Sequence, residues 1–448
     1  MSLKKALQSS LFFVLFASIG GGIGYFHFPS TPLAGTVLSK PTKEISVAVL
    51  PKEKKRSGFD ATPLTEREWQ NYKEARSALL RQVVVLNLPT EYVEAEPPLP
   101  QISWQIPLFD HPEWIVVHRN GRNIEASVDP EQLAAYIEKE IQPAIRPAEH
   151  VRILALPQEN SRAMVEGESM KDGWNLQSAI VAGFTAKHVA NGLFSITIPI
   201  QKESGAIRNE TAVPMNEFTL LSRGRSNFAG SAGNRIFNLK KAFSEHVHGS
   251  LIAPGASFSF VEILDGPVEV STGWKEALGI FLGEELRPTP GGGICQASTT
   301  VYRAALLAGL PIEEQRNHSL YVTYYTQHGE GLDATIFPGE QDLIFRNNTP
   351  GYILILTRTE GTEAIVEFYG TPDGREVTLE GPYRFHDAPE EFKEELRQEK
   401  KVGLARNDIG WRRRITRADG STETNILLSR YLDTIPLYTK KDGMIVSE

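Results

Sequence analysis

The chain holds a single cysteine, Cys295, among 448 residues. One thiol can form neither an intrachain disulfide nor a cysteine-based metal cluster, so packing of apolar side chains must stabilise the fold. Hydrophobic residues make up 41% of the sequence, which is close to the average of globular proteins. At about 150 residues per domain, the length predicts about three domains. Cys295 itself is a small core residue, a link to another chain or a nucleophile.

The net negative charge of the chain limits the classes of molecule that it is expected to bind. Lysine and arginine number 47 against 55 aspartates and glutamates, which gives a formal net charge of −8. Such a chain does not attract phosphate backbones, so we expect no nucleic acid partner. The sequence contains no HExxH pattern, no P-loop and no dinucleotide-binding fingerprint. We therefore expect no metal and no cofactor.

The N-terminus carries an export signal. Lys4 and Lys5 precede an uncharged stretch at residues 6–26, which is about as long as the ~20 residues that span a bilayer as a helix. Lysines before such a stretch favour a cytoplasmic N-terminus. The alternative is a cleaved signal peptide, but Ser18 and Gly20 match the usual cleavage site poorly. We favour an uncleaved membrane anchor, and both alternatives place the bulk of the chain outside the cytoplasm of a bacterium.

Composition divides the chain into five parts. These are an N-terminal membrane anchor or signal segment (1–28), a Pro-rich linker with one helix (29–100), an α+β region (101–216), a core domain (217–370) and a β-rich C-terminal extension (371–448). Hydrophobic periodicity predicts helices and strands in each of the last three parts. The predicted fold class is therefore multidomain α+β.

Local patterns locate several elements of the α+β region. Residues 114–117 are typical of a strand, and Asp129 is a plausible N-cap for a helix through residue 141. A second, looser copy of this combination of strand and helix predicts a helix at residues 176–183 and a strand at residues 193–200.

Similar patterns mark the linker, the core domain and the extension. Residues 66–85 and 234–247 have the period of amphipathic helices, and residues 257–260 alternate as a strand. Asp419 and Gly420 form the predicted turn of a hairpin in the extension.

Cys295 lies at the start of a predicted helix that follows three glycines, with only Ile294 between the last glycine and the cysteine. The apolar positions that follow recur at helical spacing, and Gly309 is a natural end. Unpaired N–H groups and the helix dipole stabilise a thiolate in the first turn, which lowers its pKa. The N–H groups of Gly291, Gly292 and Gly293, with that of Cys295, can hold an oxyanion.

A cysteine nucleophile needs a base and a group that orients the base. His318 starts an alternating run, residues 318–325, that predicts a strand, and Asp333 lies in the next predicted strand, residues 332–336. The order of cysteine, histidine and aspartate on a helix and an antiparallel sheet is that of papain-like and transglutaminase-like enzymes. The predicted register, however, separates His318 from Asp333 by about 20 Å. Either the turn lies earlier, or the partner is Asp342, or there is no triad.

Each of these residues also has a simpler interpretation. A free cysteine is usually a small buried hydrophobe, and the glycines before Cys295 are then only a flexible loop. Gln296 and Thr299 either contact the substrate or cap the helix. His318 alone is more often a core or surface histidine.

Several short motifs follow one another in the core domain. They are Arg235-Ile236-Phe237-Asn238, residues 254–260, residues 291–300, Asn317-His318-Ser319, residues 332–335 and residues 342–347. With these motifs, residues 238–347 closely resemble the VanW family, which is named for an accessory product of vancomycin-resistance clusters. The resemblance implies association with the bacterial cell wall but no settled activity. The upstream α+β region is similar to the peptidoglycan-binding modules that often precede this domain.

Two functional hypotheses follow. In the first, the protein is a membrane-anchored cysteine hydrolase or acyl transferase (transpeptidase) that acts on peptidoglycan peptides. Cys295 attacks the amide carbonyl, His318 transfers the proton, and Asp333 or Asp342 orients His318. In the second, the protein is a non-catalytic peptidoglycan-binding or scaffold protein, and Cys295 is structural.

Overall fold

The structure is a computed structural model that describes residues 65–90, 96–100, 102–120, 123–157, 162–281, 285–432, 438–441 and 444–447. These residues belong to one compact unit, Leu64–Glu448. The expected N-terminal anchor, with Lys4 and Lys5, and the first part of the Pro-rich linker lie outside the described residues. Within the described ranges, no helix is both long and apolar enough to cross a membrane.

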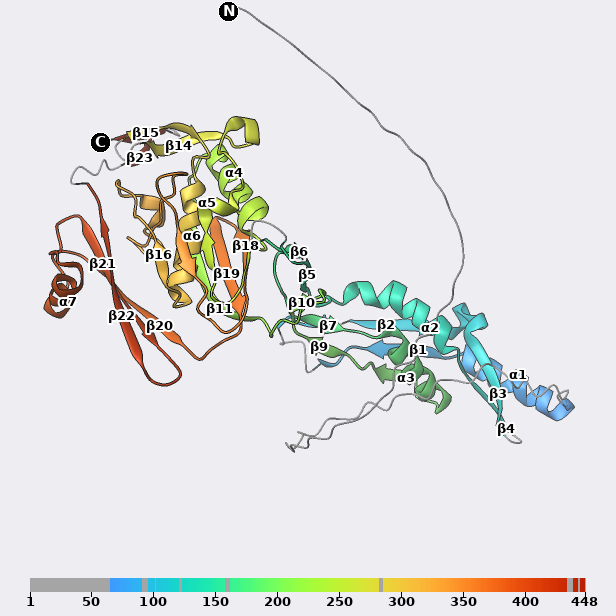
Figure 1. Ribbon diagram of the computed structural model, residues 1–448. Helices are drawn as coiled ribbons and strands as arrows, with labels where there is room; N and C mark the ends of the chain where they lie inside the picture. Colours follow the sequence, from blue (N-terminus) through green and yellow to red (C-terminus); the bar gives the residue numbers. More distant parts are fainter. Residues whose placement is uncertain are drawn as a thin grey trace, which may run out of the picture. The chain divides into compact units, whose positions relative to one another are not determined.

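The described residues of the upstream part of the unit form three α-helices, some short 3-10 and π turns and several small sheets (Figure 1). Two sheets have three strands each, in the orders β2-β1-β8 and β10-β5-β6, and two antiparallel pairs join β3 to β4 and β7 to β9. The elements are α1 (Glu66–Leu80), β1 (Val83–Asn87), β2 (Ser103–Pro107), β3 (Ile115–Asn120), β4 (Asn123–Val128), α2 (Pro130–Tyr136), β5 (Val151–Ala155), β6 (Met164–Glu166), β7 (Gly173–Asn175), α3 (Ser178–Ala190), β8 (Ser195–Thr197), β9 (Gln201–Glu203) and β10 (Ile207–Asn209).

Local sequence signals account for much of this region. The Asp129 side chain accepts a hydrogen bond from the backbone N–H of Glu131 at 2.9 Å and caps α2, as predicted. α3 and β8 overlap the second predicted helix and strand. The structure adds β1, which pairs with β2 in antiparallel and with β8 in parallel orientation. Leu86 on β1 is fully buried in the core of this region, so this part of the linker contributes to folded structure.

The core domain is built on a four-stranded antiparallel sheet in the order β11-β19-β18-β12. Helix α6 packs against β11 and β19, and Figure 1 shows it beside this sheet. The elements are β11 (Thr219–Asn227), α4 (Gly233–Lys241), which continues as a short π-helix (Ala242–Val247), β12 (Leu251–Ile252), β13 (Ser257–Ser259), α5 (Phe260–Ile263), β14 (Glu276–Phe281), β15 (Glu285–Pro290), α6 (Ile294–Leu307), β16 (Ile312–Glu314), β17 (Ile344–Arg346), β18 (Ile353–Glu360) and β19 (Glu363–Gly370).

A glycine permits the close contact between helix and sheet. A Cβ at Gly224 on β11 would lie 2.1 Å from the carbonyl oxygen of Thr300 on α6. Only glycine therefore allows α6 to approach the strand this closely. On its inner side, α6 buries Ala297, Val301 and Ala304 completely. The predicted packing of a cysteine-bearing helix on an antiparallel sheet is confirmed.

The strands expected at residues 318–325 and 332–336 do not form. The chain there is a loop that contains one short turn of 3-10 helix, Thr323–Tyr325. Four backbone carbonyls of this loop accept hydrogen bonds from the guanidinium of Arg303, which projects from α6 and is only 2% exposed. A side chain thus satisfies the backbone groups that a neighbouring strand would otherwise satisfy. The papain- or transglutaminase-like arrangement, with histidine and acid on adjacent strands, is not confirmed.

The described part of the C-terminal extension contains a three-stranded antiparallel sheet, in the order β20-β21-β22, with helix α7 packed on it, and a separate antiparallel pair, β23 with β24. The predicted hairpin turn at Asp419 and Gly420 joins β21 to β22, and Gly420 adopts the positive φ of 82° that the turn needs. The elements are β20 (Glu376–Tyr383), α7 (Glu390–Lys400), β21 (Asp408–Thr416), β22 (Thr422–Arg430), β23 (Tyr438–Lys441) and β24 (Met444–Ser447).

Candidate functional site

The glycines before Cys295 form a tightly packed turn and not a flexible loop. Gly291 and Gly293 have φ of 75° and 107°, which side chains rarely adopt. A Cβ on Gly292 would lie 2.3 Å from the carbonyl oxygen of Ala277, and one on Gly293 would lie 2.7 Å from Cγ of Arg235. Glycine is therefore required both by conformation and by space where α6 begins.

The backbone amides of this turn fall into two groups. Those of Gly291 and Gly292 donate hydrogen bonds to the carbonyls of Lys275 and Thr289 at 3.1 and 3.2 Å. Those of Gly293 and Cys295 have no hydrogen-bond acceptor among the described residues. Since an oxyanion needs unoccupied donors, the predicted role fits Gly293 and Cys295 but not the amides of Gly291 and Gly292.

Cys295 is the second residue of α6 and is partly exposed. Its Sγ lies 3.7 Å from Oγ1 of Thr335 and 3.7 Å from the carbonyl oxygen of Ile336. Burial alone would raise the pKa of the thiol, but interaction with the His318 imidazole outweighs burial and lowers the pKa below its ordinary value. The first turn of α6 also favours the thiolate.

His318 is paired with Asp333. Nδ1 of His318 contacts Oδ2 of Asp333, and the backbone N–H of His318 donates to the same oxygen at 2.8 Å. Both side chains are buried, with 5% and 1% exposure. Burial alone would lower the pKa of His318, but interaction with Asp333 and with the Cys295 thiol outweighs burial and raises the pKa. The buried imidazole is therefore held in its protonated form, beside a thiol that is easily ionised.

The structure distinguishes between the two candidate carboxylates. Asp333 reaches His318 because both lie on loops, so the strand register that separated them does not apply. Asp342 accepts hydrogen bonds from the backbone N–H groups of Val261 and Leu343 at 2.9 and 2.7 Å, and from the hydroxyl of Ser259. Asp342 thus caps the short helix α5 and is not part of the cluster around Cys295.

Gln296 and Thr299 are engaged inside the protein. Both are fully buried. The Gln296 amide donates to Oγ of Ser226 at 3.1 Å and accepts from Arg235 at 2.5 Å, and Oγ1 of Thr299 accepts from the backbone N–H of Ala334 at 3.1 Å. The two side chains therefore fasten α6 to its neighbours, and their hydrogen-bonding groups are not free for a substrate.

Comparison with known proteins gives two matches and one negative result. The family description "VanW like protein" matches residues 234–369. Residues 234–369 form a VanW-like domain. The chain is also 34% identical to the uncharacterized protein YoaR of Bacillus subtilis (strain 168) over 147 residues, which are 32% of this chain and 46% of the relative. The chain thus spans less than half of the relative's length. No solved structure matches the chain significantly.

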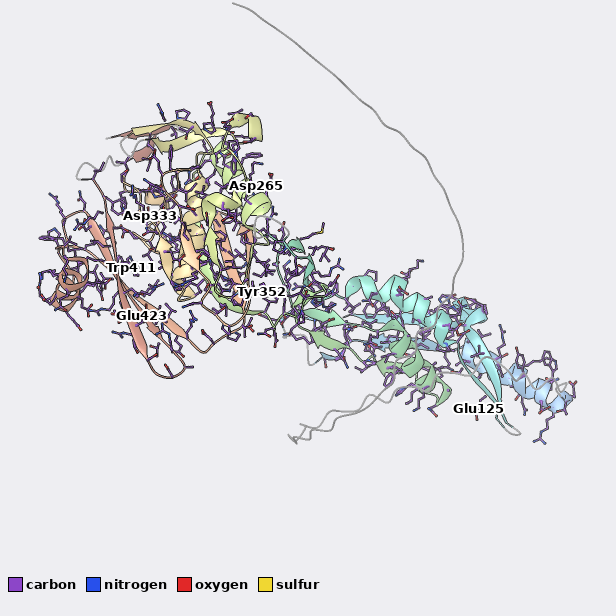
Figure 2. The ribbon with its side chains drawn as sticks, viewed as in Figure 1. Glu125, Asp265, Asp333, Tyr352, Trp411 and Glu423 are labelled. Atoms are coloured by element: carbon purple, nitrogen blue, oxygen red, sulfur yellow. The ribbon has the colours of Figure 1, made fainter. Side chains whose placement is uncertain are left out.

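The VanW-like domain contains Cys295, His318 and Asp333. A residue outside this domain also holds the Asp333 side chain in place. Tyr431, beyond the end of β22, donates a hydrogen bond from its hydroxyl to Oδ1 of Asp333 at 2.7 Å. Gln315 donates to the backbone carbonyl of Asp333 at 2.6 Å. Sequence reasoning missed Tyr431, which is 98 residues from its partner and carries no local signal of the contact. Figure 2 shows Asp333 with the dense side-chain packing around it.

The site combines a thiol, an imidazole and a carboxylate, which are groups that take part in acid–base chemistry. Among the described residues of the VanW-like domain and its neighbours, no three histidine, cysteine, aspartate or glutamate side chains could hold a metal ion. The arrangement provides a thiol with a lowered pKa, an imidazole with a raised pKa and two amides without an acceptor among the described residues. These are the parts that acyl transfer through a thioester requires.

Proposed function

We propose that this protein is an exported cysteine hydrolase or acyl transferase that acts on the peptides of bacterial peptidoglycan. The observation that carries the proposal is the linked set of Cys295, His318 and Asp333, in which His318 lowers the pKa of the thiol and Asp333 fixes the imidazole. The cysteine lies at a helix start, where the dipole also favours a thiolate.

The first half of the reaction breaks the amide. The Cys295 thiolate adds to the carbonyl carbon, and the open amides of Gly293 and Cys295 stabilise the oxyanion that forms. Protonated His318 then donates its proton to the departing amine nitrogen. The C–N bond breaks, the amine leaves, and the acyl group remains on Sγ of Cys295 as a thioester.

The second half releases the acyl group. Water attacks the thioester in a hydrolase, and an amine of a second peptide attacks it in an acyl transferase. Neutral His318 takes the proton of the attacking group, and Cys295 leaves as a thiolate. The Asp333 carboxylate pairs with the imidazolium each time it forms, so the histidine keeps one orientation through both halves.

The proposed location rests on the sequence and on the VanW-like domain. The basic residues before the apolar stretch at 6–26 support an uncleaved anchor that places the remaining chain outside the membrane. The resemblance of residues 101–216 to wall-binding modules supports a second contact with peptidoglycan. In this arrangement the upstream region holds the wall while the VanW-like domain acts on its peptides.

Alkylation of Cys295 tests the activated thiol directly, because it is the chain's only cysteine. We expect iodoacetamide to modify the full-length wild-type protein at pH 6 about tenfold faster than the His318→Gln variant, since loss of the imidazolium raises the pKa of the thiol. Mass spectrometry follows the reaction. Equal, slow alkylation of both proteins would identify Cys295 as a structural thiol.

Incubation with purified peptidoglycan tests the reaction itself. We expect wild-type protein to change the peptide cross-links or stems, seen as new fragments after muramidase digestion and mass spectrometry. The Cys295→Ala variant is the matched control and should leave the fragments unchanged. Binding of both proteins to the wall without any change in fragments would instead support the non-catalytic scaffold.

A further inference from the structure

Arg235 lies directly beside the first turn of α6. A Cβ on Gly293 would lie 2.7 Å from Cγ of Arg235. Nη1 of Arg235 donates to Oε1 of Gln296 at 2.5 Å and to Oγ of Ser231 at 2.9 Å. Arg235 therefore contacts the residues two positions before and one position after Cys295.

The same guanidinium also contacts the segment that carries the base. It lies over the ring of Tyr324, 4.6 Å from the ring centre, and the ring of the next residue, Tyr325, lies 5.4 Å from that of His318. A stacked arginine keeps a defined orientation, because the flat guanidinium rests on the aromatic face. Arg235 thus bridges the elements that supply the nucleophile and the base.

The charge of Arg235 is not neutralised inside the protein. Its two side-chain acceptors, Gln296 and Ser231, are neutral, and within the described ranges no carboxylate forms an ion pair with it. Other arginines of the unit differ in this respect: Arg358 pairs with Glu367 and Arg412 with Glu380. Both acceptors engage Nη1, and Nη2 and Nε of the partly buried guanidinium have no acceptor among the described residues, so these donors can serve an anionic ligand.

We propose that Arg235 binds a carboxylate of the substrate, next to the bond that Cys295 attacks. A guanidinium recognises a carboxylate with two parallel hydrogen bonds, and one that is already oriented loses little freedom on binding. The preferred substrate is then a peptide with a free carboxylate within about one residue of the reacting carbonyl. This inference rests on the proposed function, and it specifies the substrate class of the same site.

A pair of alkylating peptides tests the inference on the full-length protein. N-iodoacetylglycine carries a carboxylate one residue from its reactive carbon. N-iodoacetylglycinamide is the uncharged control, because an amide replaces the carboxylate. The measured quantity is the ratio of their alkylation rates at Cys295. We expect this ratio to fall about tenfold from wild type to Arg235→Met, the effect of one charge-assisted contact. Lys240→Met, which removes an exposed charge from the same helix, should leave the ratio unchanged.

Two further measurements keep the result interpretable. Arg235→Lys retains the charge, so its ratio should exceed that of Arg235→Met; equal ratios would assign the effect to displacement of Gln296 and overturn the proposal. In wild type the ratio should fall as salt rises from about 0.05 to 0.5 M, because salt screens a partly exposed ion pair. A ratio insensitive both to salt and to Arg235→Met would also overturn it.

Failure of this inference differs from failure of the proposed function. Slow alkylation by both peptides, with no dependence on His318, would show that Cys295 is not activated. Fast alkylation by both peptides, with equal ratios in wild type and in Arg235→Met, would be consistent with the proposed function and would contradict only the carboxylate site at Arg235.

Discussion

A carboxylate that is 1% exposed is stable in a protein interior only when its oxygens are satisfied, and Asp333 meets this need from two separate parts of the chain. Its Oδ2 accepts from the backbone and the ring of His318, and its Oδ1 accepts from Tyr431. The acid is thereby fixed against the imidazole. Two single-residue changes separate its electrostatic role from its structural one.

Asp333→Asn should make Cys295 less reactive near neutral pH. Asp333 helps to raise the pKa of His318, so the substitution lowers the pKa of the imidazole and weakens the imidazolium that stabilises the thiolate. The inflection in the pH dependence of Cys295 alkylation should move to higher pH, with about tenfold less thiolate at pH 6 for each pH unit moved. An inflection at the same pH in wild type and variant would contradict the role of Asp333.

Tyr431→Phe should destabilise the folded protein by about 1–3 kcal/mol, because it leaves one oxygen of a buried carboxylate without its donor. Urea unfolding measures the change. Tyr383→Phe is the matched control, since its hydroxyl makes no hydrogen bond within the described residues and its loss should cost less than about 0.5 kcal/mol. Equal losses in the two variants would mean that the contact with Asp333 is not stabilising.

At the scale of elements, the start of α6 decides where the thiol points. The glycine turn enters the helix with Gly293 in the left-handed region, and Ala277 and Arg235 close the space around it. The sequence predicted this helix and its first turn, because its apolar spacing is local. It could not predict that the glycines are packed and not flexible, since the atoms that confine them come from distant segments.

Gly293→Ala should destabilise the protein by about 1–3 kcal/mol and slow alkylation of Cys295, because the residue has φ of 107° and its new Cβ would meet Arg235. Gly183→Ala is the control. Gly183 lies within α3 with open space around it, so alanine should be neutral or stabilise by up to about 1 kcal/mol. The expectation is wrong if both variants show the same stability and the same alkylation rate.

The loop after α6 shows where pattern analysis fails. Alternating residues at 318–325 predicted a strand, yet this segment belongs to a loop in which the carbonyls of Tyr325 and Gln327 accept hydrogen bonds from Arg303. The incorrect strands in turn produced a register that separated His318 from Asp333. A buried arginine that serves a loop leaves no periodic signal, so the contact of histidine and acid could be proposed from residue order but not located.

At the scale of the molecule, the C-terminal extension completes the VanW-like domain. The Asn317 side chain exchanges hydrogen bonds with the backbone of Arg430, at 2.8 and 3.4 Å. Ser429 donates to the carbonyl of Gly331 at 2.5 Å, and Trp411, labelled in Figure 2, donates to that of Glu330 at 2.8 Å. The loop with His318 and Asp333 is thus fastened to β21 and β22. Sequence analysis treated the extension as a separate part, because these contacts join positions about a hundred residues apart.

These hydrogen bonds predict that the loop with His318 and Asp333 and the C-terminal extension unfold locally in the same event. In Asn317→Ala, amide hydrogen exchange should become about tenfold faster both in residues 317–333 and in 422–432, because the lost contacts joined the two segments. Asn191→Ala, which removes an exposed side-chain hydrogen bond at the end of α3, should change neither segment. Faster exchange confined to residues 317–333 would show that the extension is an independent unit that only borders the site. Faster exchange in both segments would show that the extension must fold for His318 and Asp333 to be held together.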